Sequence, residues 1–237
     1  YVAWPETRLG TRERRHVGVP LRSRFEPSLY KPRGTARLLV LGGSQGASAL
    51  NDRMPEVAAR LRGAVPGLEI VHQTGRDRER PVARAYEREG VSGARVVPFL
   101  EDVAAELREA DLVVARAGAV TVAEIAAVGR AAVFVPFPHA ADDHQAKNAE
   151  ALAAKGAALS IRQEAADVVR LASEIQALLQ DDARRVAMAD AARAHGRPEA
   201  ARVLASQLLK LARISPRPVS SPRQRNGSGH SRDLEVS

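Results

Sequence analysis

One feature most constrains the fold of this chain: four apolar residues, Leu38–Leu41, run straight into two glycines, Gly42 and Gly43. An uninterrupted apolar run of this length is typical of a parallel strand that is buried on both faces. From Ala47 the chain continues in helical spacing, so we expect a strand that turns directly into a helix. The first amides of such a helix lack acceptors and its dipole is positive there, which favours an anion, above all phosphate. A tight turn without a ligand is an equally good interpretation of this stretch on its own.

The alternation of strand and helix continues along the chain. Strands are predicted at residues 37–41, 68–73, 94–98, 111–115, 131–136 and 157–161. Helices are predicted at residues 47–62, 78–89, 101–109, 120–128, 142–155, 166–180, 182–194 and 198–212. Strands that alternate with helices form βαβ units, so we predict an α/β fold: a Rossmann-like parallel sheet with helices on both faces.

The two ends of the chain differ in composition from its middle. Residues 1–36 are rich in Arg, Pro and Glu, and we interpret them as a connector with the remnant of a preceding domain. Residues 37–212 make up the predicted domain. Residues 213–237 are rich in Pro, Ser and Arg with few apolar side chains, so we expect a disordered tail. The sequence begins with Tyr1 rather than Met, which indicates a fragment or a processed product.

The formal net charge of +8 belongs to the ends of the chain. Residues 1–37 carry a balance of +6 and residues 211–237 one of +3, which leaves −1 for residues 38–210. The middle therefore has no basic stripe with interleaved aromatic residues, and we predict no nucleic-acid partner. There is no apolar run long enough to span a bilayer and no signal peptide is recognisable.

Three loops of the predicted sheet share its carboxyl edge, where open parallel sheets bind ligands. They are residues 42–46, 116–119 and 136–145, and their glycines, hydroxyls, amides and acids favour one common pocket. No Lys follows Gly46, which excludes a P-loop, and the glycine spacing does not fit a dinucleotide fingerprint. We therefore predict no NAD and no other cofactor.

Thr121 and Glu124 have the spacing of a capping box, in which Thr121 caps a helix and Glu124 reaches back to the first amide. The functional alternative is that the Glu124 carboxylate accepts hydrogen bonds from a diol such as ribose. On its own the sequence favours the capping box.

The histidines and cysteines give no support for a metal site. His139 and His144 are five residues apart, which differs from a helical zinc pair, and no third ligand is evident. The chain has no cysteine, which excludes disulfides, thiolate metal ligands and Cys nucleophiles. Asn148 is interpreted as an amide for sugar hydroxyls or as a solvated helix-start residue. His72 is expected to be an ordinary core or surface histidine.

Taken together, four segments resemble one known family. They are residues 42–47, 116–127, 135–139 and 143–149. They are similar to the C-terminal, donor-binding domain of the GT-B glycosyltransferases of family 28. The members that combine these segments transfer N-acetylglucosamine (GlcNAc) from UDP-GlcNAc to lipid I, undecaprenyl-diphosphate-MurNAc-pentapeptide, which gives lipid II in peptidoglycan synthesis. The resemblance covers about residues 1–210 and implies a UDP-GlcNAc-dependent hexosyltransferase.

The resemblance also implies a donor site. Ser44 would hold the phosphate, Leu100 would offer backbone groups to the uracil, and Glu124 would bind the ribose hydroxyls. Gln145, with His144, would contact the GlcNAc. The whole implied UDP-GlcNAc-binding set is Arg22, Ser44, Gln45, Leu100, Ala119, Val120, Thr121, Val122, Ala123, Glu124, His144 and Gln145.

Two departures from the family pattern bear on function. Val19 stands where the family has Asn, in the segment that leads to the nucleotide-contacting Arg22. The family's N-terminal domain, with its general-base His, acceptor diphosphate site and membrane-facing apolar patch, has no counterpart in this sequence. We therefore expect no catalytic residue in this chain, and donor binding without turnover.

The resemblance implies partners and a location for the full-length enzyme. Lipid I would bind through the N-terminal domain, and the enzyme would be cytoplasmic and peripheral on the inner face of the cell membrane. Two alternatives remain open: a UDP-sugar glycosyltransferase with another lipid acceptor, and a non-catalytic nucleotide-sugar-binding module.

Overall fold

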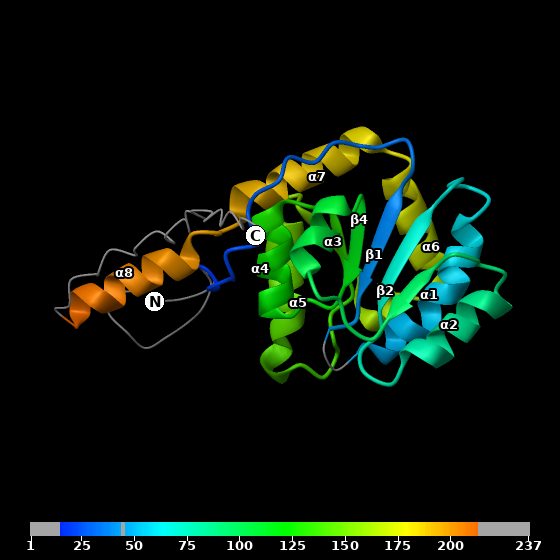
Figure 1. Cartoon of the computed structure of the whole chain (residues 1–237), viewed down its shortest axis with the longest axis horizontal. Coiled ribbons are helices and arrows are strands. Elements are labelled where there is room, and N and C mark those ends of the chain that lie inside the picture. The colour runs from blue at the N-terminus through cyan, green and yellow to red at the C-terminus, as the bar shows by residue number, and fades with distance from the viewer. Residues whose placement is uncertain (1–14, 44–45, 213–237) are drawn as a thin grey trace, which may run out of the picture.

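The computed structural model describes residues 15–43 and 46–212 (Figure 1). Within these residues six strands form one sheet in the order β3-β2-β1-β4-β5-β6, and every neighbouring pair is parallel. The strands are β1 (Arg37–Leu41), β2 (Glu69–Gln73), β3 (Arg95–Val97), β4 (Leu112–Ala115), β5 (Ala132–Phe134) and β6 (Ala158–Ser160). The predicted Rossmann-like α/β fold is confirmed.

Each predicted helix is present, with ends that shift by one or a few residues. The helices are α1 (Ser48–Leu61), α2 (Glu79–Arg88), α3 (Val103–Glu109), α4 (Ala119–Val128), α5 (His144–Ala153), α6 (Val168–Leu179), α7 (Asp182–His195) and α8 (Ala200–Leu211), with short 3₁₀ turns η1 (Ala141–Asp143) and η2 (Gln163–Ala165). The predicted helix 142–155 is divided into η1 and α5, because Asp142 and Asp143 adopt left-handed backbone angles, with φ of 51° and 55°.

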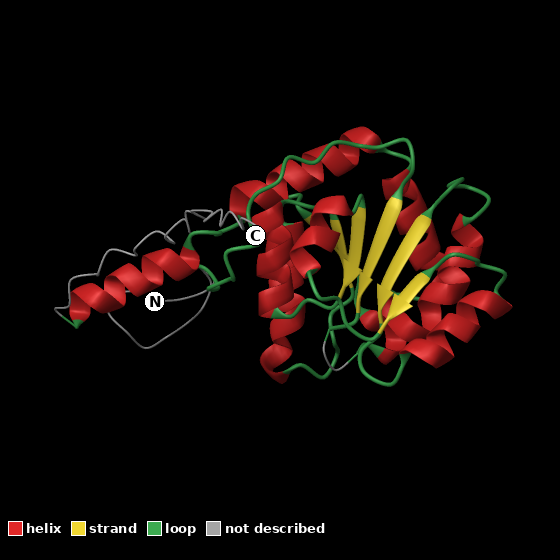
Figure 2. Cartoon of the chain, in the orientation of Figure 1, coloured by secondary structure: helices red, strands yellow, loops and turns green. Residues whose placement is uncertain are grey.

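Helices cover both faces of the sheet (Figure 2), and β1 separates two cores. Leu38 and Val40 pack with residues of α1, α2 and α6, whereas Leu39 and Leu41 pack with residues of α3, α4 and α5. All four are buried. Side chains of a strand alternate between its faces, so a continuously apolar strand is the expected result of helices on both sides.

The described part of the connector, residues 15–36, packs against the domain. Tyr30 is buried, its hydroxyl donates to Asp111 Oδ1 at 2.9 Å, and it accepts from Arg185 Nε at 2.8 Å. Phe25 is buried in the core beside α3 and α4. In Figure 1 this segment runs beside α7 before it enters β1. The connector is therefore fixed to the domain by contacts with residues far along the chain.

The end of the described chain leaves the sheet. Helix α8 extends away from the other helices in Figure 1, with Leu208 and Leu211 exposed. The predicted disordered tail, residues 213–237, and residues 1–14 of the connector lie outside the described residues. In the part of the chain that the structure describes, no helix combines the length and apolar character needed to cross a bilayer.

Candidate functional site

The carboxyl ends of β1 and β4 adjoin at the point where the strand order reverses. From β1 the chain moves outward to β2 and β3, then returns to β4 and continues to β5 and β6 on the other side. A reversal of this kind opens a crevice between loops, which is where open α/β sheets bind ligands. The visible strand arrows in Figure 2 point to the same edge. The loops after β1, β4 and β5 therefore share one edge, as predicted.

In the described part of the chain, four helices begin at this edge without a side-chain cap, namely α1, α2, α4 and α5, and of these α1 and α4 follow the adjoining strands β1 and β4. The N-cap residues are Ala47 for α1 and Gly118 for α4. The first bond within α4 runs from the Val122 amide to the Gly118 carbonyl at 2.9 Å, so the three preceding helical amides have no acceptor in the helix. Both helix dipoles present their positive ends here. The arrangement suits a ligand with two adjacent negative groups.

The capping box predicted at Thr121 and Glu124 is wrong. Helix α4 begins at Ala119, so Thr121 already lies inside the first turn and Glu124 inside the second. Gly118 has the extended backbone, with φ −61° and ψ 144°, that ends the preceding loop and starts the helix. The Glu124 carboxylate is therefore not used as a cap.

A cleft of about 300 Å³ lies beside α4, between the connector and the loop after β3. Four residues of the predicted donor set line it: Arg22 from the connector, Leu100 from the loop, and Val120 and Glu124 from α4. The Val120 side chain is 54% exposed. Arg22 and Glu124 lie about a hundred positions apart in the sequence, so the fold alone brings them together.

Glu124 is half-buried in this cleft, and its environment changes its acidity. Burial raises the pKa of its carboxyl from the ordinary 4.5 to about 7, and the positive charge of Arg22 opposes part of that rise. Desolvation disfavours the charged form of an acid, whereas a nearby cation favours it. A carboxyl tuned in this way within a cleft is a candidate for a functional role.

The raised pKa predicts how stability depends on pH. Between pH of about 4.5 and 7 the folded chain keeps a proton on Glu124 that the unfolded chain releases, so this carboxyl lowers stability as pH rises through that window. The new side chain of the Glu124→Gln variant cannot ionise, so this variant should be more stable than the parent at pH 8. We expect a difference of about 1 kcal/mol, which is less than the full pKa shift implies because solvent reaches part of the carboxyl. Urea denaturation at pH 4 and pH 8 measures this. An equal difference at the two pH values would contradict it.

The turn after β1 rests on the end of β2. The Gly42 amide donates to the Gln73 carbonyl at 2.9 Å, and Gly43 and Gly46 have φ of +75° and +74°. A Cβ at Gly46 would lie 2.5 Å from the Thr74 carbonyl oxygen. Glycine is therefore required at Gly46 both by backbone angle and by close approach. The predicted phosphate-binding Ser44 and its neighbour Gln45 lie outside the described residues.

The two left-handed glycines of this turn provide a matched pair of variants. Gly46→Ala should lower the free energy of unfolding by about 3 kcal/mol, from left-handed strain plus the clash with the Thr74 carbonyl. Gly43→Ala carries the same strain, but nothing lies within 4 Å of its Cβ, so about 1 kcal/mol is expected. Chemical denaturation compares them. Equal losses would show that the approach to Thr74 does not matter.

The loop after β5 holds two further residues of the predicted set. The Phe137 amide donates to Gln145 Oε1 at 3.1 Å, and His144 Nδ1 lies 2.8 Å from the Ala141 carbonyl, to which it donates. His144 is exposed and Gln145 is half-buried. Both side chains thus bond to their own loop and lie outside the 300 Å³ cleft.

The other predicted residues lie on α4. Val122 is fully buried in the core, so only its backbone can face a ligand. Ala119, Thr121 and Ala123 are partly exposed. Asn148, which sequence analysis placed near sugar hydroxyls or solvent, is buried and donates to the Ala117 carbonyl at 3.1 Å. It supports the loop that leads into α4.

Arg116, for which the sequence patterns predict no role, joins two of the three loops. Its guanidinium donates to the Val135 and Pro136 carbonyls at 2.9 and 3.1 Å and lies 5.5 Å from the centre of the Phe137 ring. Burial, and then the cation of Arg53, lower its pKa. The sequence signal that could have identified Arg116 is its position directly after the fourth predicted strand, at the edge where parallel sheets bind ligands.

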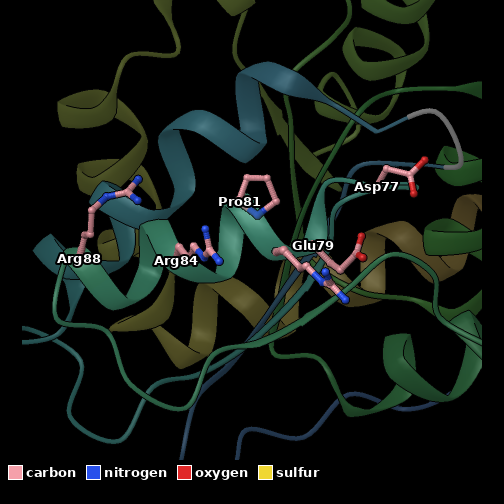
Figure 3. Close-up of a pocket in the computed structure, with 6 residues that line it drawn as sticks. Asp77, Glu79, Pro81, Arg84 and Arg88 are labelled. Carbon is pink, nitrogen blue, oxygen red and sulfur yellow. The ribbon is translucent and has the colours of Figure 1, made fainter.

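A larger hollow, of about 760 Å³, lies along α2 and contains none of the predicted site residues. Figure 3 shows its labelled residues along the helix, from Arg88 at one end to Asp77 at the other. Its arginines Arg80, Arg84 and Arg88 follow a spacing of four and are exposed. Such a row is typical of a solvated helix face. Among the described residues no group of three His, Asp or Glu side chains has the geometry of a metal site.

A sequence profile and two similar relatives point to the same protein family. A sequence profile described as the glycosyltransferase family 28 C-terminal domain matches residues 37–204. A protein of Sorangium cellulosum is 52% identical over 217 residues, which cover 90% of this chain and 54% of the relative. A protein of Xylella fastidiosa is 48% identical over 177 residues, covering 75% and 48%. Both are named UDP-N-acetylglucosamine--N-acetylmuramyl-(pentapeptide) pyrophosphoryl-undecaprenol N-acetylglucosamine transferase.

Solved structures agree. The crystal structure of Acinetobacter baumannii MurG has a TM-score of 0.75 and 34% identity, and the match covers 88% of this chain and 59% of that one. The structure of WaaG, a glycosyltransferase involved in lipopolysaccharide biosynthesis, has a TM-score of 0.56 at 18% identity and shares the fold. The chain spans about half the length of the curated relatives it matches.

Proposed function

Because this chain belongs to glycosyltransferase family 28, whose C-terminal domain it contains, we propose that it binds UDP-GlcNAc at the carboxyl edge of its sheet. In the full-length protein the bound donor supplies GlcNAc to lipid I and gives lipid II. We assign the acceptor to the part of the relatives that lies outside the match with this chain. No nucleic acid, metal or cofactor enters this proposal.

The cleft beside α4 is the observation that carries the proposal. It joins a cation, Arg22, an apolar surface from Leu100 and Val120, and the Glu124 carboxyl within about 300 Å³. A carboxylate accepts hydrogen bonds from two hydroxyls at once, which suits the vicinal diol of ribose. Leu100 is half-buried where it lines the cleft, and we assign its backbone groups to the edge of the pyrimidine. This half of the site therefore fits a uridine.

The uncapped starts of α1 and α4 suit the diphosphate. Their free amides and dipoles favour the two negative groups that link uridine to the sugar. During transfer the bond between the anomeric carbon and the diphosphate oxygen breaks, and negative charge builds on the leaving UDP. Fixed amides directed at that charge stabilise the transition state as well as the bound donor. Gln145 and His144, on the loop after β5, are assigned to the sugar.

We also propose that the full-length protein works on the cytoplasmic side of the cell membrane as a peripheral protein. The curated relatives are named for an acceptor linked to undecaprenol, a lipid, and a nucleotide-sugar donor is a water-soluble partner. An enzyme that joins these two substrates has to reach the membrane surface. Transfer requires the acceptor hydroxyl in line with the anomeric carbon, which both parts of the protein must position.

Calorimetric titration of the 237-residue chain tests donor binding. We expect saturable binding of UDP-GlcNAc and no binding of a GDP-sugar at equal concentration. Gln145→Ala should weaken binding of UDP-GlcNAc but leave UDP unaffected, because it removes a contact to the sugar alone. Arg88→Ala, in the larger hollow on α2, is the control and should change neither.

Equal binding of the uridine and guanosine sugars would contradict the proposal. Lipid II formation by this chain alone would contradict the assignment of the acceptor.

A further inference from the structure

Three buried polar side chains form a connected row beneath the turn that follows β1. They come from three elements: Asn51 from α1, His72 from β2 and Tyr86 from α2, and none is more than 6% exposed. His72 Nε2 lies 3.1 Å from Asn51 Oδ1, and His72 Nδ1 lies 3.0 Å from the Tyr86 hydroxyl. From its sequence context His72 is expected to be no more than an ordinary core or surface histidine.

The direction of every hydrogen bond in the row is determined by its last member. Asn51 Nδ2 donates to the Thr74 carbonyl at 3.1 Å, so Asn51 Oδ1 is the atom that faces His72. That oxygen can only accept, so His72 Nε2 carries the proton and Nδ1 accepts from the Tyr86 hydroxyl. Burial lowers the pKa of His72 to about 3, so the ring is neutral, as this pattern requires.

The row ends at the residue on which the glycine turn rests. The Thr74 carbonyl, which accepts from Asn51, is the atom 2.5 Å from a Cβ built on Gly46. The Thr74 amide donates to the Val97 carbonyl at 2.9 Å, and the neighbouring Gln73 carbonyl accepts from the Gly42 amide. The position of the Thr74 peptide group therefore determines how closely both ends of the turn approach β2.

We propose that the Tyr86–His72–Asn51 row positions Gly42 and Gly46, and with them the start of α1, for the donor phosphates, by fixing the Thr74 carbonyl against which Gly46 packs. The inference rests on the proposed function, in which the start of α1, which directly follows Gly46, holds the diphosphate together with the start of α4. Apolar side chains of similar size would fill this space with comparable stability, but they would leave the carbonyl without its donor. The polar row contributes geometry, and its three members are positioning residues.

Asn51→Leu separates positioning from stability when it is compared with Val57→Ala. Both sites are buried in α1, but Val57 is an apolar residue of the core, whereas Asn51 donates to the Thr74 carbonyl. Asn51→Leu should raise the Kd for UDP-GlcNAc by about tenfold, the equivalent of one buried hydrogen bond. Val57→Ala should change it by less than about twofold, although it also lowers the midpoint of urea denaturation.

Two measurements, one on the buried row and one on Gly42, do not depend on the donor. In ¹⁵N NMR spectra the proton of His72 should reside on Nε2, with Nδ1 unprotonated at pH 7. Hydrogen exchange of the Gly42 amide should be about tenfold faster in Asn51→Leu than in Val57→Ala. A proton on Nδ1, or equal exchange in the two variants, would overturn the positioning role. Failure of the parent chain to bind UDP-GlcNAc would contradict the proposed function instead, and amide exchange would still decide the inference.

Discussion

Glu124→Ala is expected to weaken UDP-GlcNAc binding by roughly 10- to 100-fold, the range for losing hydrogen bonds to a charged acceptor. The carboxylate is the acceptor assigned to the ribose diol. Of the two acids among the described residues that line the cleft, Glu124 is half-buried and Glu101 is exposed. Alanine leaves both hydroxyls without that partner inside a desolvated site. Calorimetry at pH 8, where the parent carboxyl is ionised, gives the full difference.

Glu101→Ala is the matched control for this variant. Glu101 lines the same cleft and carries the same charge, but its side chain is exposed, so water replaces it at little cost. We expect a change in Kd of less than about threefold, mainly from the altered charge near the donor. If the two alanine variants bind UDP-GlcNAc equally, Glu124 has no specific contact and the diol assignment fails.

Asp111→Ala is expected to lower the free energy of unfolding by about 3 kcal/mol, which would make it one of the most destabilising single changes in this chain. Asp111 is 1% exposed, accepts from the Tyr30 hydroxyl at 2.9 Å, and accepts from the Arg37 amide at 2.8 Å through its other oxygen. Its removal leaves the buried guanidinium of Arg185, which donates to Tyr30, without a nearby buried carboxylate. Urea denaturation measures the loss.

Asp182→Ala provides the comparison for Asp111. Asp182 pairs directly with Arg185, whereas Asp111 is connected to it through the Tyr30 hydroxyl. The Asp182 side chain is 66% exposed, so about 0.5 kcal/mol is expected. Losses of similar size would contradict the buried role of Asp111. Because Tyr30 anchors the connector that carries Arg22, Asp111→Ala should also weaken UDP-GlcNAc binding, whereas Asp182→Ala should not.

The fold was predictable because its signals are local. The apolar run at Leu38–Leu41 and the regular alternation of elements depend on neighbours in the sequence, and six parallel strands in the structure confirm them. The capping box was predicted wrongly because Thr121 and Glu124 match one in spacing, while the position of Gly118 as the N-cap of α4 depends on the loop geometry before it.

Local sequence patterns do not predict contacts between residues that are far apart in the chain. The bond between Asn148 and the Ala117 carbonyl spans 31 positions, and the row that joins His72 to Asn51 crosses three elements. The proximity of Arg22 to Glu124 was implied only by resemblance to a family, since nothing in the spacing of two residues a hundred positions apart predicts it. Packing of the connector against the domain brings them together.

The half-buried Glu124 affects the enthalpy of donor binding that calorimetry measures. A carboxyl with a pKa of about 7 is protonated in about half of the free molecules at neutral pH, and the diol assignment requires it ionised in the complex. Binding of the nucleotide sugar at neutral pH therefore releases, on average, less than one proton per molecule to the buffer. The observed enthalpy then depends on the ionisation enthalpy of that buffer, and the donor competes with hydrogen ions for the domain.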